Sequence, residues 1–309
     1  MDKIKVALIY GGDSSEREVS LKGGNAFKQA IDSSKYELFT YDPAYDIKKI
    51  VDDSDKIDTA FILLHGKNGE DGRIQGLLDL LNIPYQCSGV LASALAMNKA
   101  KCKDFYKINS IPVAEHLVFS SYTQDLEDLI IQKTGLPAVI KPGIGGSSIA
   151  LSIVEKKEDI KNAAFSALKE SEFVLAEKFI QGTEITCAVI GNNKPEALPL
   201  IEICPGKKHK LFDYEAKYKP GETEEICPAR IDEKTRSLIQ ELCIKIHCLL
   251  GCKGYSRTDL IIENDKIYVL ETNTIPGMTE TSLLPLAAKA AGISFAGLID
   301  RLLTLSMEK

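Results

Sequence analysis

The sequence contains no Cys-x-x-Cys pair, although eight cysteines are spread through its 309 residues. Cysteines this dilute do not build a disulfide framework, so we expect reduced thiols in a reducing compartment. The first ten residues also lack the cationic region, the long apolar stretch and the cleavage site of a signal peptide. Both absences make the cytoplasm the expected location.

No apolar run approaches the ~18 residues that a membrane-spanning helix needs. The chain carries 38 Lys and Arg residues against 44 Asp and Glu residues, a formal net charge of −6, and no concentrated basic stripe. With 44% hydrophobic and 27% charged residues, the composition is typical of a globular protein. We therefore expect neither a membrane nor a nucleic acid as a partner, and a phosphate ligand would need local cations.

The common nucleotide-binding motifs are missing too. Gly-x4-Gly-Lys-[Ser/Thr] does not occur, and Gly143-Ile-Gly145 lacks the third glycine of the dinucleotide fingerprint. Residues 141–148, Lys-Pro-Gly-Ile-Gly-Gly-Ser-Ser, instead follow an apolar run at 136–140. Their glycines and serines let backbone N–H groups approach an anion closely, so they favour a phosphate-binding loop as much as an ordinary flexible turn.

Four potential metal ligands, Cys243, His247, Cys248 and Cys252, fall within ten residues. They leave a Cys/His metal sensor as an alternative function. Residues 237–251, however, have apolar side chains at helical spacing, and a free cysteine behaves as a small core residue. We favour a core helix here.

Alternating strand and helix patterns predict an α/β fold. A strand at 4–10, a helix at 15–31, a strand at 59–64 and a helix at 74–81 resemble an open sheet whose loops gather at one edge, where ligands bind. The pattern changes near residue 96. We expect an N-terminal α/β domain over 1–95, a central domain over 96–183 and a C-terminal domain over 184–309.

Shorter signals fill in the second half of this plan. We expect a lysine-rich helical stretch at 97–108, strands at 113–119, 137–141, 185–190 and 197–203, and final helices at 283–291 and 295–305. Between the two final helices Gly292 is the stop and Ser294 the cap.

Residues 257–273 read as a hairpin around the turn signal Asn264-Asp265. A two-residue turn would pair Asp259 with Leu270, whereas a three-residue loop would pair Asp259 with Glu271 and Arg257 with Asn273. We favour the second register, with Leu260, Ile262, Tyr268 and Leu270 on the opposite face. Two carboxylates and an amide oxygen then suit Mg²⁺ shared with phosphates, although an ion pair on a solvated face fits the composition as well.

The irregular loop 274–282 leads into the apolar helix that begins at Leu283. Free N–H groups at that helix start suit a carboxylate ligand, and ordinary capping by Ser282 is the alternative.

Five ordered motifs, covering nearly the full chain, resemble the D-alanine–D-alanine ligases of the ATP-grasp superfamily. They are Gly11-Gly-Asp-Ser-Ser-Glu16-Arg-Glu-Val-Ser20, His65-Gly-Lys-Asn-Gly-Glu70-Asp-Gly72, Lys141-Pro with Gly146-Ser-Ser, Asp213-Tyr-Glu-Ala-Lys217-Tyr218, and Glu271-Thr-Asn273-Thr-Ile-Pro-Gly-Met-Thr. The resemblance implies a three-domain ATP-grasp fold, built from α/β and α+β domains, and a reaction in two steps. ATP phosphorylates the carboxylate of one D-alanine, and the amine of a second D-alanine then displaces phosphate to give a dipeptide for peptidoglycan precursors.

The resemblance also implies roles for individual residues. Glu16 and His65 would bind the first D-alanine, and Ser282 and the Leu283 amide the second. Arg257 and the Gly277 amide would stabilise the oxyanion, while Tyr218 would link to Ser147 and Glu16. ATP would be held by Lys99, Lys141, Glu177, Lys178, Ile180, Glu184 and Lys217. Asp259, Glu271 and Asn273 would bind two Mg²⁺ ions, with Mn²⁺ as a substitute.

Two departures and several alternatives accompany this reading. Asn98 stands where the family usually has Asp, and Ala150 where a glycine commonly closes the phosphate loop, which leaves the backbone angle at 150 open. A ligase using D-lactate or D-serine as second substrate is the alternative on the same scaffold, and Tyr218 favours D-alanine. A nucleotide-binding regulator without turnover is another alternative. The family implies a homodimer and a lid around residues 204–228.

Overall fold

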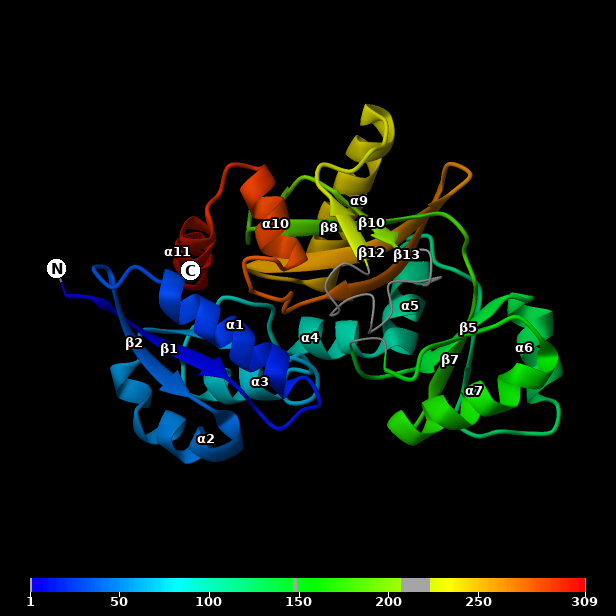
Figure 1. The fold of residues 1–309 in the computed structure, drawn as a ribbon. Helices are drawn as coiled ribbons and strands as arrows, with labels where there is room; N and C mark the ends of the chain where they lie inside the picture. The colour runs from blue at the N-terminus through cyan, green and yellow to red at the C-terminus, as the bar shows by residue number, and fades with distance from the viewer. Residues whose placement is uncertain (1, 147–148, 207–222, 309) are drawn as a thin grey trace.

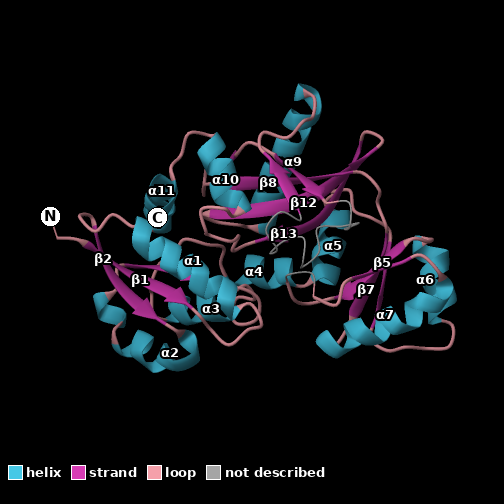
Figure 2. Cartoon of the chain, viewed as in Figure 1, coloured by secondary structure: helices cyan, strands magenta, loops and turns pink. Residues whose placement is uncertain are grey.

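Three β-sheets organise the computed structural model, which describes residues 2–146, 149–206 and 223–308 (Figures 1 and 2). The chain runs from the first sheet through a small antiparallel sheet to a larger one, and its last helices return to the first sheet (Figure 1). The mixed helix and strand content, with one parallel and two antiparallel sheets, confirms the predicted α/β and α+β class.

The first sheet is parallel, in the order β2-β1-β3, so the loops after β1 and β3 leave it at the same edge. Its strands are β1 (Ile4–Tyr10), β2 (Tyr36–Tyr41) and β3 (Thr59–Leu63), and its helices are α1 (Arg17–Ala30), α2 (Pro43–Asp52) and α3 (Arg73–Leu80), with a 3-10 turn η1 (Ser54–Lys56). Every residue of β3 is buried, as expected for a strand covered on both faces. The helices predicted at 15–31 and 74–81 are confirmed to within two residues.

The second sheet is antiparallel, in the order β4-β7-β5-β6, and α6 and α7 pack on it at the far end of the molecule from the first sheet (Figure 1). Its elements are β4 (His116–Phe119), β5 (Ala138–Pro142), β6 (Ser152–Val154), β7 (Val174–Lys178), α6 (Leu126–Thr134) and α7 (Lys157–Glu170). Two helices, α4 (Val90–Met97) and α5 (Lys99–Ile108), precede it. The predicted stretch 97–108 therefore starts at Lys99, because Asn98 is extended and caps α5.

The third sheet has the order β11-β10-β8-β12-β13, with β9 beside β8. Its strands are β8 (Thr183–Ile190), β9 (Glu196–Ala197), β10 (Ile201–Pro205), β11 (Thr223–Ile226), β12 (Tyr255–Glu263) and β13 (Lys266–Asn273). The helix α9 (Glu233–Leu250) packs on this sheet, and two helices, α10 (Leu283–Ala290) and α11 (Phe295–Ser306), follow β13 in the chain. The single strand predicted at 197–203 is wrong. It is split into β9 and β10 around Pro199, which has no N–H for the ladder.

The hydrophobic cores do not follow the order of the chain. Leu284 of α10 and Leu298 of α11 share one core with Val6 and Phe61 of the first sheet. The core of the third sheet includes Tyr106 of α5. Long-range packing thus ties both ends of the chain together, and the division at residues 95 and 183 stays a prediction.

The β12–β13 hairpin combines features of both registers considered for it. Asn264 and Asp265 both have positive φ and form a two-residue turn, so the predicted three-residue loop is wrong. A bulge at Leu270 then shifts the register by one residue, and Asp259 pairs with Glu271 and Arg257 with Asn273, as predicted.

The bulge also changes the apolar face of the hairpin. Leu260 and Ile262 pair with Val269 and Ile267 in the core of the third sheet, whereas Tyr268 and Leu270 pack with Ile261 and Ile180 in a separate cluster. The predicted grouping of Leu260 and Ile262 with Tyr268 and Leu270 is therefore wrong.

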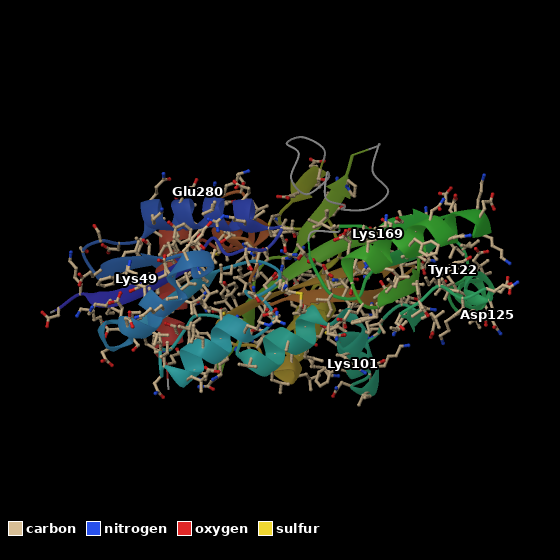
Figure 3. All side chains as sticks on the ribbon, turned by 90° about the horizontal axis from the view of Figure 1, so that it is seen from below. Lys49, Lys101, Tyr122, Asp125, Lys169 and Glu280 are labelled. Carbon is tan, nitrogen blue, oxygen red and sulfur yellow. The ribbon has the colours of Figure 1, made fainter. Side chains whose placement is uncertain are left out.

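The charged side chains labelled in Figure 3, among them Lys49, Lys101, Lys169 and Asp125, are exposed and come from different parts of the fold. Within the described ranges no single helix has both the length and the apolar character needed to cross a membrane. The helices α10 and α11 pass such a test only as a pair, and they are bent by 102° against each other.

Gly254 provides a test of the contact between the first and third sheets. Its φ is +67°, and a Cβ there would lie 1.7 Å from the backbone oxygen of Gln86. Gln86 is fixed because its side chain exchanges hydrogen bonds with the backbone of Ile62. We expect Gly254→Ala to lower the free energy of unfolding by about 3 kcal/mol or more, measured by urea denaturation.

Gly292→Ala is the matched control, because φ is +80° there and no atom lies within 4 Å of the added Cβ. It should cost only about 1 kcal/mol, the strain of alanine in the left-handed region. Equal losses in the two variants would contradict the close contact at Gly254.

Candidate functional site

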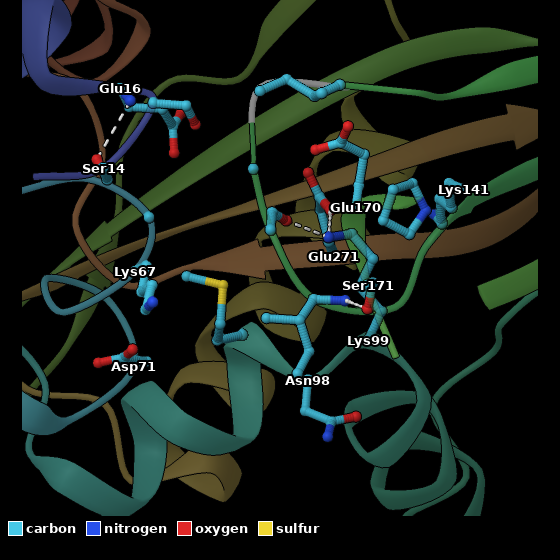
Figure 4. Close-up of a pocket in the computed structure, with 18 of the residues that line it drawn as sticks. Ser14, Glu16, Lys67, Asp71, Asn98, Lys99, Lys141, Glu170, Ser171 and Glu271 are labelled. Carbon is cyan, nitrogen blue, oxygen red and sulfur yellow. Dashed lines mark hydrogen bonds and ion pairs between the residues drawn. The ribbon is translucent and has the colours of Figure 1, made fainter. Parts of the chain in front are cut away.

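A cavity of about 780 Å³ lies where the three sheets meet (Figure 4). Glu16 and Lys67 come from one side, and Lys99, Glu271 and Lys141 from the other (Figure 4). Of the site residues predicted from the sequence, six line it: Glu16, Lys99, Lys141, Glu184, Asp259 and Glu271. Carboxylates and ammonium groups distant in the chain therefore share one concave surface.

Asp259 and Glu271 are cross-strand neighbours on β12 and β13. Arg257 holds Asp259 in a bidentate ion pair, with Nε donating to Oδ1 at 2.9 Å and Nη2 to Oδ2 at 2.8 Å. Thr186 of β8 donates its hydroxyl to the same Oδ1 at 2.5 Å. The ion pair considered for this face is thus present, but it is nearly buried rather than solvated, because the side chains of Arg257 and Asp259 are only 12% and 11% exposed.

Lys99 ties the start of α5 to the loop 143–146. Its backbone N–H donates to Gly143 O at 3.0 Å, and its ammonium group donates to Gly145 O and lies 3.9 Å from Glu271 Oε2. Asn98 accepts from the N–H of Lys101 at 3.0 Å, which is the capping bond that an aspartate would make. This departure from the family pattern therefore keeps α5 in place.

Ala150 adopts a φ of +53°, in the left-handed region that glycine occupies without strain. An alanine there costs of the order of 1 kcal/mol. The backbone angle at residue 150, which the sequence left open, is therefore the one suited to glycine, although the residue is alanine.

Lys141, at the end of β5, is paired inside the protein. Its Nζ lies 2.6 Å from Glu177 Oε2, and the Nζ of Lys103 lies 2.7 Å from Glu177 Oε1. Burial raises the pKa of Glu177, yet the two ammonium groups outweigh it and hold the pKa at about 2. The sequence reading did not single out Lys103, although its place one helical turn after Lys99 was a signal.

Glu16 lies at the start of α1, and two loops leave room for its carboxylate. A Cβ at Gly66 would be 2.7 Å from Glu16 Oε2, and one at Gly146 would be 2.9 Å from the same atom. Ser14 donates to the backbone oxygen of His65 at 2.7 Å and joins the loops after β1 and β3. The two glycines therefore allow three loops to meet around one carboxylate.

His65 and Glu70, in the loop after β3, are both buried. Burial lowers the pKa of His65 to about 4, so the ring is neutral, and its Nε2 has no hydrogen-bond partner among the described residues. Glu70 accepts from the N–H of Gly66 at 2.8 Å. Burial, followed by the charge of Glu16, raises the pKa of Glu70 to about 8. No role was predicted for Glu70, although it stands in the His65 motif.

Nine predicted residues do not line the cavity. They are His65, Glu177, Lys178, Ile180, Arg257, Asn273, Gly277, Ser282 and Leu283. Three others, Ser147, Lys217 and Tyr218, lie outside the described residues, as does most of the predicted lid.

Several of the nine touch residues of the cavity wall or continue its loops. Arg257 does so through Asp259, and Glu177 through Lys141. Ser282 precedes α10 without a capping bond from its side chain; its hydroxyl instead accepts from the N–H of Thr279 at 3.1 Å. Ser282 thus occupies the N-cap position of α10, but the alternative that its side chain caps the helix by a hydrogen bond is wrong.

The residues expected around adenine are joined to the cavity by apolar packing. Leu270 lines the cavity and packs in the same cluster as Ile180. The N–H of Lys178 is taken by Glu115 O at 2.8 Å, so only its carbonyl remains for a base.

The residues proposed for a divalent ion fit the preference of Mg²⁺ for carboxylate and amide oxygens. Asp259 and Glu271 face the cavity together, while Asn273 accepts from the N–H of Ile275 at 3.0 Å. Across the part of the chain that the structure describes, no three His, Cys, Asp or Glu side chains form a cage for a metal. Phosphate oxygens and water would complete the shell, as is usual for Mg²⁺.

The Cys/His cluster of α9 has other partners. His247 is buried, with Nδ1 2.8 Å from Ser256 Oγ and Nε2 3.1 Å from Gly191 O. Cys243 lies in the core of the third sheet, and Cys248 is exposed. Both ring nitrogens of His247 are therefore engaged in holding α9 on its sheet.

Glu70 makes stability depend on pH. The pKa of Glu70 in the folded protein, about 8, exceeds the ordinary value of 4.5. The contribution of protonated Glu70 to the free energy of unfolding is therefore fully present below about pH 4.5 and is lost as the pH rises through 8. Glu70→Gln removes this dependence and keeps an acceptor for Gly66. In thermal melts with EDTA, wild type should lose Tm relative to Glu70→Gln between pH 5.5 and 9.

The exposed Glu37 supplies the control, because Glu37→Gln should follow wild type across the same pH range. Parallel curves for wild type and Glu70→Gln would show that Glu70 carries no such proton.

The chain is similar to known proteins along its whole length. Residues 46–88 match the family model for the D-ala D-ala ligase N-terminus, and residues 105–304 match that for its C-terminus. The D-alanine–D-alanine ligases of Syntrophobacter fumaroxidans and Desulfotalea psychrophila are 50% and 49% identical over 307 and 310 residues, covering 99% and 100% of this chain and 99% and 96% of theirs.

Solved structures agree with these matches. The Bacillus anthracis D-alanine–D-alanine ligase complexed with ATP superposes with a TM-score of 0.85 at 30% identity, covering 98% of this chain and 97% of that one. VanG D-Ala:D-Ser ligase from Enterococcus faecalis superposes with a TM-score of 0.84 at 30% identity, covering 99% of this chain and all of that one. The ATP-grasp architecture is confirmed. The chain belongs to the D-alanine–D-alanine ligase family.

Proposed function

We propose that this protein is an ATP-dependent ligase that joins two D-alanine molecules for peptidoglycan precursor synthesis in the cytoplasm. The observation that carries the proposal is the shared cavity, in which Lys99 and Lys141 face Asp259 and Glu271, with Glu16 on the opposite wall. Family membership over the full chain supports it.

The reaction needs a leaving group, because a free carboxylate is a poor acyl donor. A carboxylate oxygen of the first D-alanine attacks the γ-phosphorus of ATP, the bond to the bridging oxygen breaks, and ADP leaves. The amine of the second D-alanine, having lost a proton, then attacks the acyl phosphate carbonyl and expels inorganic phosphate. The acyl phosphate must also be kept away from water, which would otherwise hydrolyse it.

The phosphates are assigned to Lys99, Lys141 and the loop 143–146. Both ammonium groups reach the cavity wall, and Lys99 also fixes the loop backbone. Burial lowers the pKa of Lys141, but the carboxylates of Glu177 and Glu271 outweigh it and raise the pKa above its ordinary value, so the side chain remains cationic. Phosphoryl transfer depends mainly on such positioning and charge neutralisation. Lys217 is assigned to the same task.

Asp259, Glu271 and Asn273 would hold two Mg²⁺ ions, or Mn²⁺, which neutralise phosphate charge when bound. Arg257 keeps the carboxylate of Asp259 in a fixed orientation through two hydrogen bonds. Arg257 and the Gly277 amide are assigned to the oxyanion that develops at the acyl carbon.

The two amino acids are assigned to the side of the cavity near the first sheet. Glu16 supplies a carboxylate for the ammonium group of the first D-alanine. His65, whose Nε2 has no hydrogen-bond partner among the described residues, is assigned to the same substrate. Ser282 and the Leu283 amide, at the start of α10, are assigned to the carboxylate of the second D-alanine. Ser147 and Tyr218 are assigned to the link with Glu16.

Adenine is assigned to the apolar end of the cavity. Leu270 lines the cavity and belongs to one cluster with Ile180. The carbonyl of Lys178 and the backbone of Glu177 are assigned to the base. Glu184, also on the wall, is assigned to the ribose hydroxyls.

A D-serine ligase is the second candidate, because the VanG D-Ala:D-Ser ligase superposes almost as well as the D-alanine enzyme. We assign D-alanine as acceptor because of Tyr218. Competition between D-alanine, D-serine and D-lactate in the ligase assay tests the choice of acceptor.

The reaction itself is tested by ADP release in the presence of Mg²⁺, which we expect with D-alanine and not with L-alanine. Nucleotide binding without ADP release would indicate a regulator. Analytical ultracentrifugation tests the proposed homodimer.

Substitution of Arg257 and Lys141 separates their roles. Arg257→Ala should lower kcat for dipeptide formation by about 100-fold or more, the usual cost of losing a donor to the oxyanion. Lys141→Ala should raise the KM for ATP more than Arg257→Ala does, because it removes a phosphate contact. Initial rates at varied ATP give both constants.

Lys157→Ala is the control, since this exposed lysine pairs only with Asp128 among the described residues and lies off the cavity. Thermal melts establish that each variant is folded. Full activity in both site variants would refute the assignment.

A further inference from the structure

Three charges lie in a row beneath the phosphate end of the cavity. The carboxylate of Glu177 on β7 gives one oxygen to Lys141 of β5, at 2.6 Å, and the other to Lys103 of α5, at 2.7 Å. The side chains of Lys103, Glu177 and Lys141 are 1%, 4% and 9% exposed. Two cations therefore share one buried anion, and the group carries a net positive charge.

Stability does not account for this arrangement. Removing charges from water costs several kcal/mol per ion, and well-packed apolar side chains often replace buried ion triads without loss. A single Lys141–Glu177 pair would already satisfy both partners. Lys103 is the additional charge, and it is the most deeply buried of the three.

Only one member of the triad reaches the cavity. Lys141 lines it, whereas Lys103 and Glu177 do not. Lys103 therefore has no direct route to a ligand, and any effect it exerts on one passes through Glu177. Lys103 also stands one helical turn after Lys99 on α5. Lys99 lines the cavity itself, whereas Lys103 contacts it only through Glu177 and Lys141.

The charge balance indicates what that effect is. In a low-dielectric interior, a carboxylate 2.6 Å away largely cancels the field of an ammonium group. With Lys103 on its second oxygen, Glu177 is already neutralised and no longer cancels the charge that Lys141 presents to the cavity. The pKa of Lys103 is lowered overall, first because the side chain is buried and also because the charge of Lys141 is near, although the carboxylate of Glu177 raises it.

We propose that Lys103 is a positioning residue for nucleotide binding: it neutralises Glu177 and fixes its carboxylate, so that Lys141 presents a full positive charge to the nucleotide phosphates. This inference rests on the proposed function, which places the phosphates at Lys141. It concerns the nucleotide alone and predicts no effect on the amino-acid side of the cavity.

The test compares K103M with the double variant K103M/E177Q. Methionine keeps the length of the lysine stem but leaves Glu177 to cancel Lys141, whereas the double variant restores the net charge of the wild-type triad. We would measure the Kd of AMP-PNP by calorimetry in the presence of Mg²⁺, and the KM values for ATP and for D-alanine from initial rates. K107M is the control, because Lys107 lies on the same helix, is 42% exposed and pairs with Glu115 at 4.0 Å.

We expect K103M to raise the Kd for AMP-PNP and the KM for ATP about tenfold, the change produced by some 1.4 kcal/mol. Its KM for D-alanine should stay within about twofold of wild type. The double variant should recover binding to within about threefold, and K107M should match wild type.

Wild-type affinity in K103M would overturn the inference. So would a double variant that binds no better than K103M, because that result makes Lys103 a packing residue only. If K103M does not fold, the double variant decides: a loss of tenfold or more in it overturns the inference. Failure of wild type itself to bind AMP-PNP would instead refute the proposed function.

Discussion

The pairing of β12 with β13 is the constraint on which the site depends. Side chains on a strand alternate between its two faces, so a register slip of one residue would turn Glu271 away from Asp259. The tight turn at Asn264 and Asp265 sets one register, and the bulge at Leu270 converts it into another before the strands reach the cavity. Because Leu270 is the one additional residue in β13, the carboxylates of Asp259 and Glu271 lie on the same wall of the cavity.

The charges of the cavity are held in place by neighbours of opposite sign without being wholly cancelled. Asp259 is fixed by Arg257 and Thr186. Glu177 is shared between Lys103 and Lys141. A nucleotide with divalent ions carries both signs of charge, and a wall of fixed carboxylates and ammonium groups complements it with little reorganisation on binding. This is the physical basis of the proposed phosphoryl transfer.

Local features were predictable from the sequence, and features that depend on packing were not. The helix α1, the strands β1 and β3, and the cap at Ser294, which accepts from Gly297 at 3.1 Å, follow from periodicity and capping chemistry. The packing of α11 on the first sheet and the burial of Lys103 depend on contacts between distant segments, which no local pattern encodes. The pairing of Asp259 with Glu271 was predicted for the wrong reason, since a bulge and not a longer loop produces it.

The central claim is that Asp259 and Glu271 hold divalent ions against phosphates neutralised by Lys99 and Lys141. The most direct test is a crystal structure with AMP-PNP and Mn²⁺, in which anomalous scattering locates the metal. The account predicts Mn²⁺ peaks in contact with both carboxylates and with phosphate oxygens, and the ammonium group of Lys141 within hydrogen-bond distance of a phosphate. Mn²⁺ bound away from both carboxylates, or phosphates remote from Lys141, would contradict it.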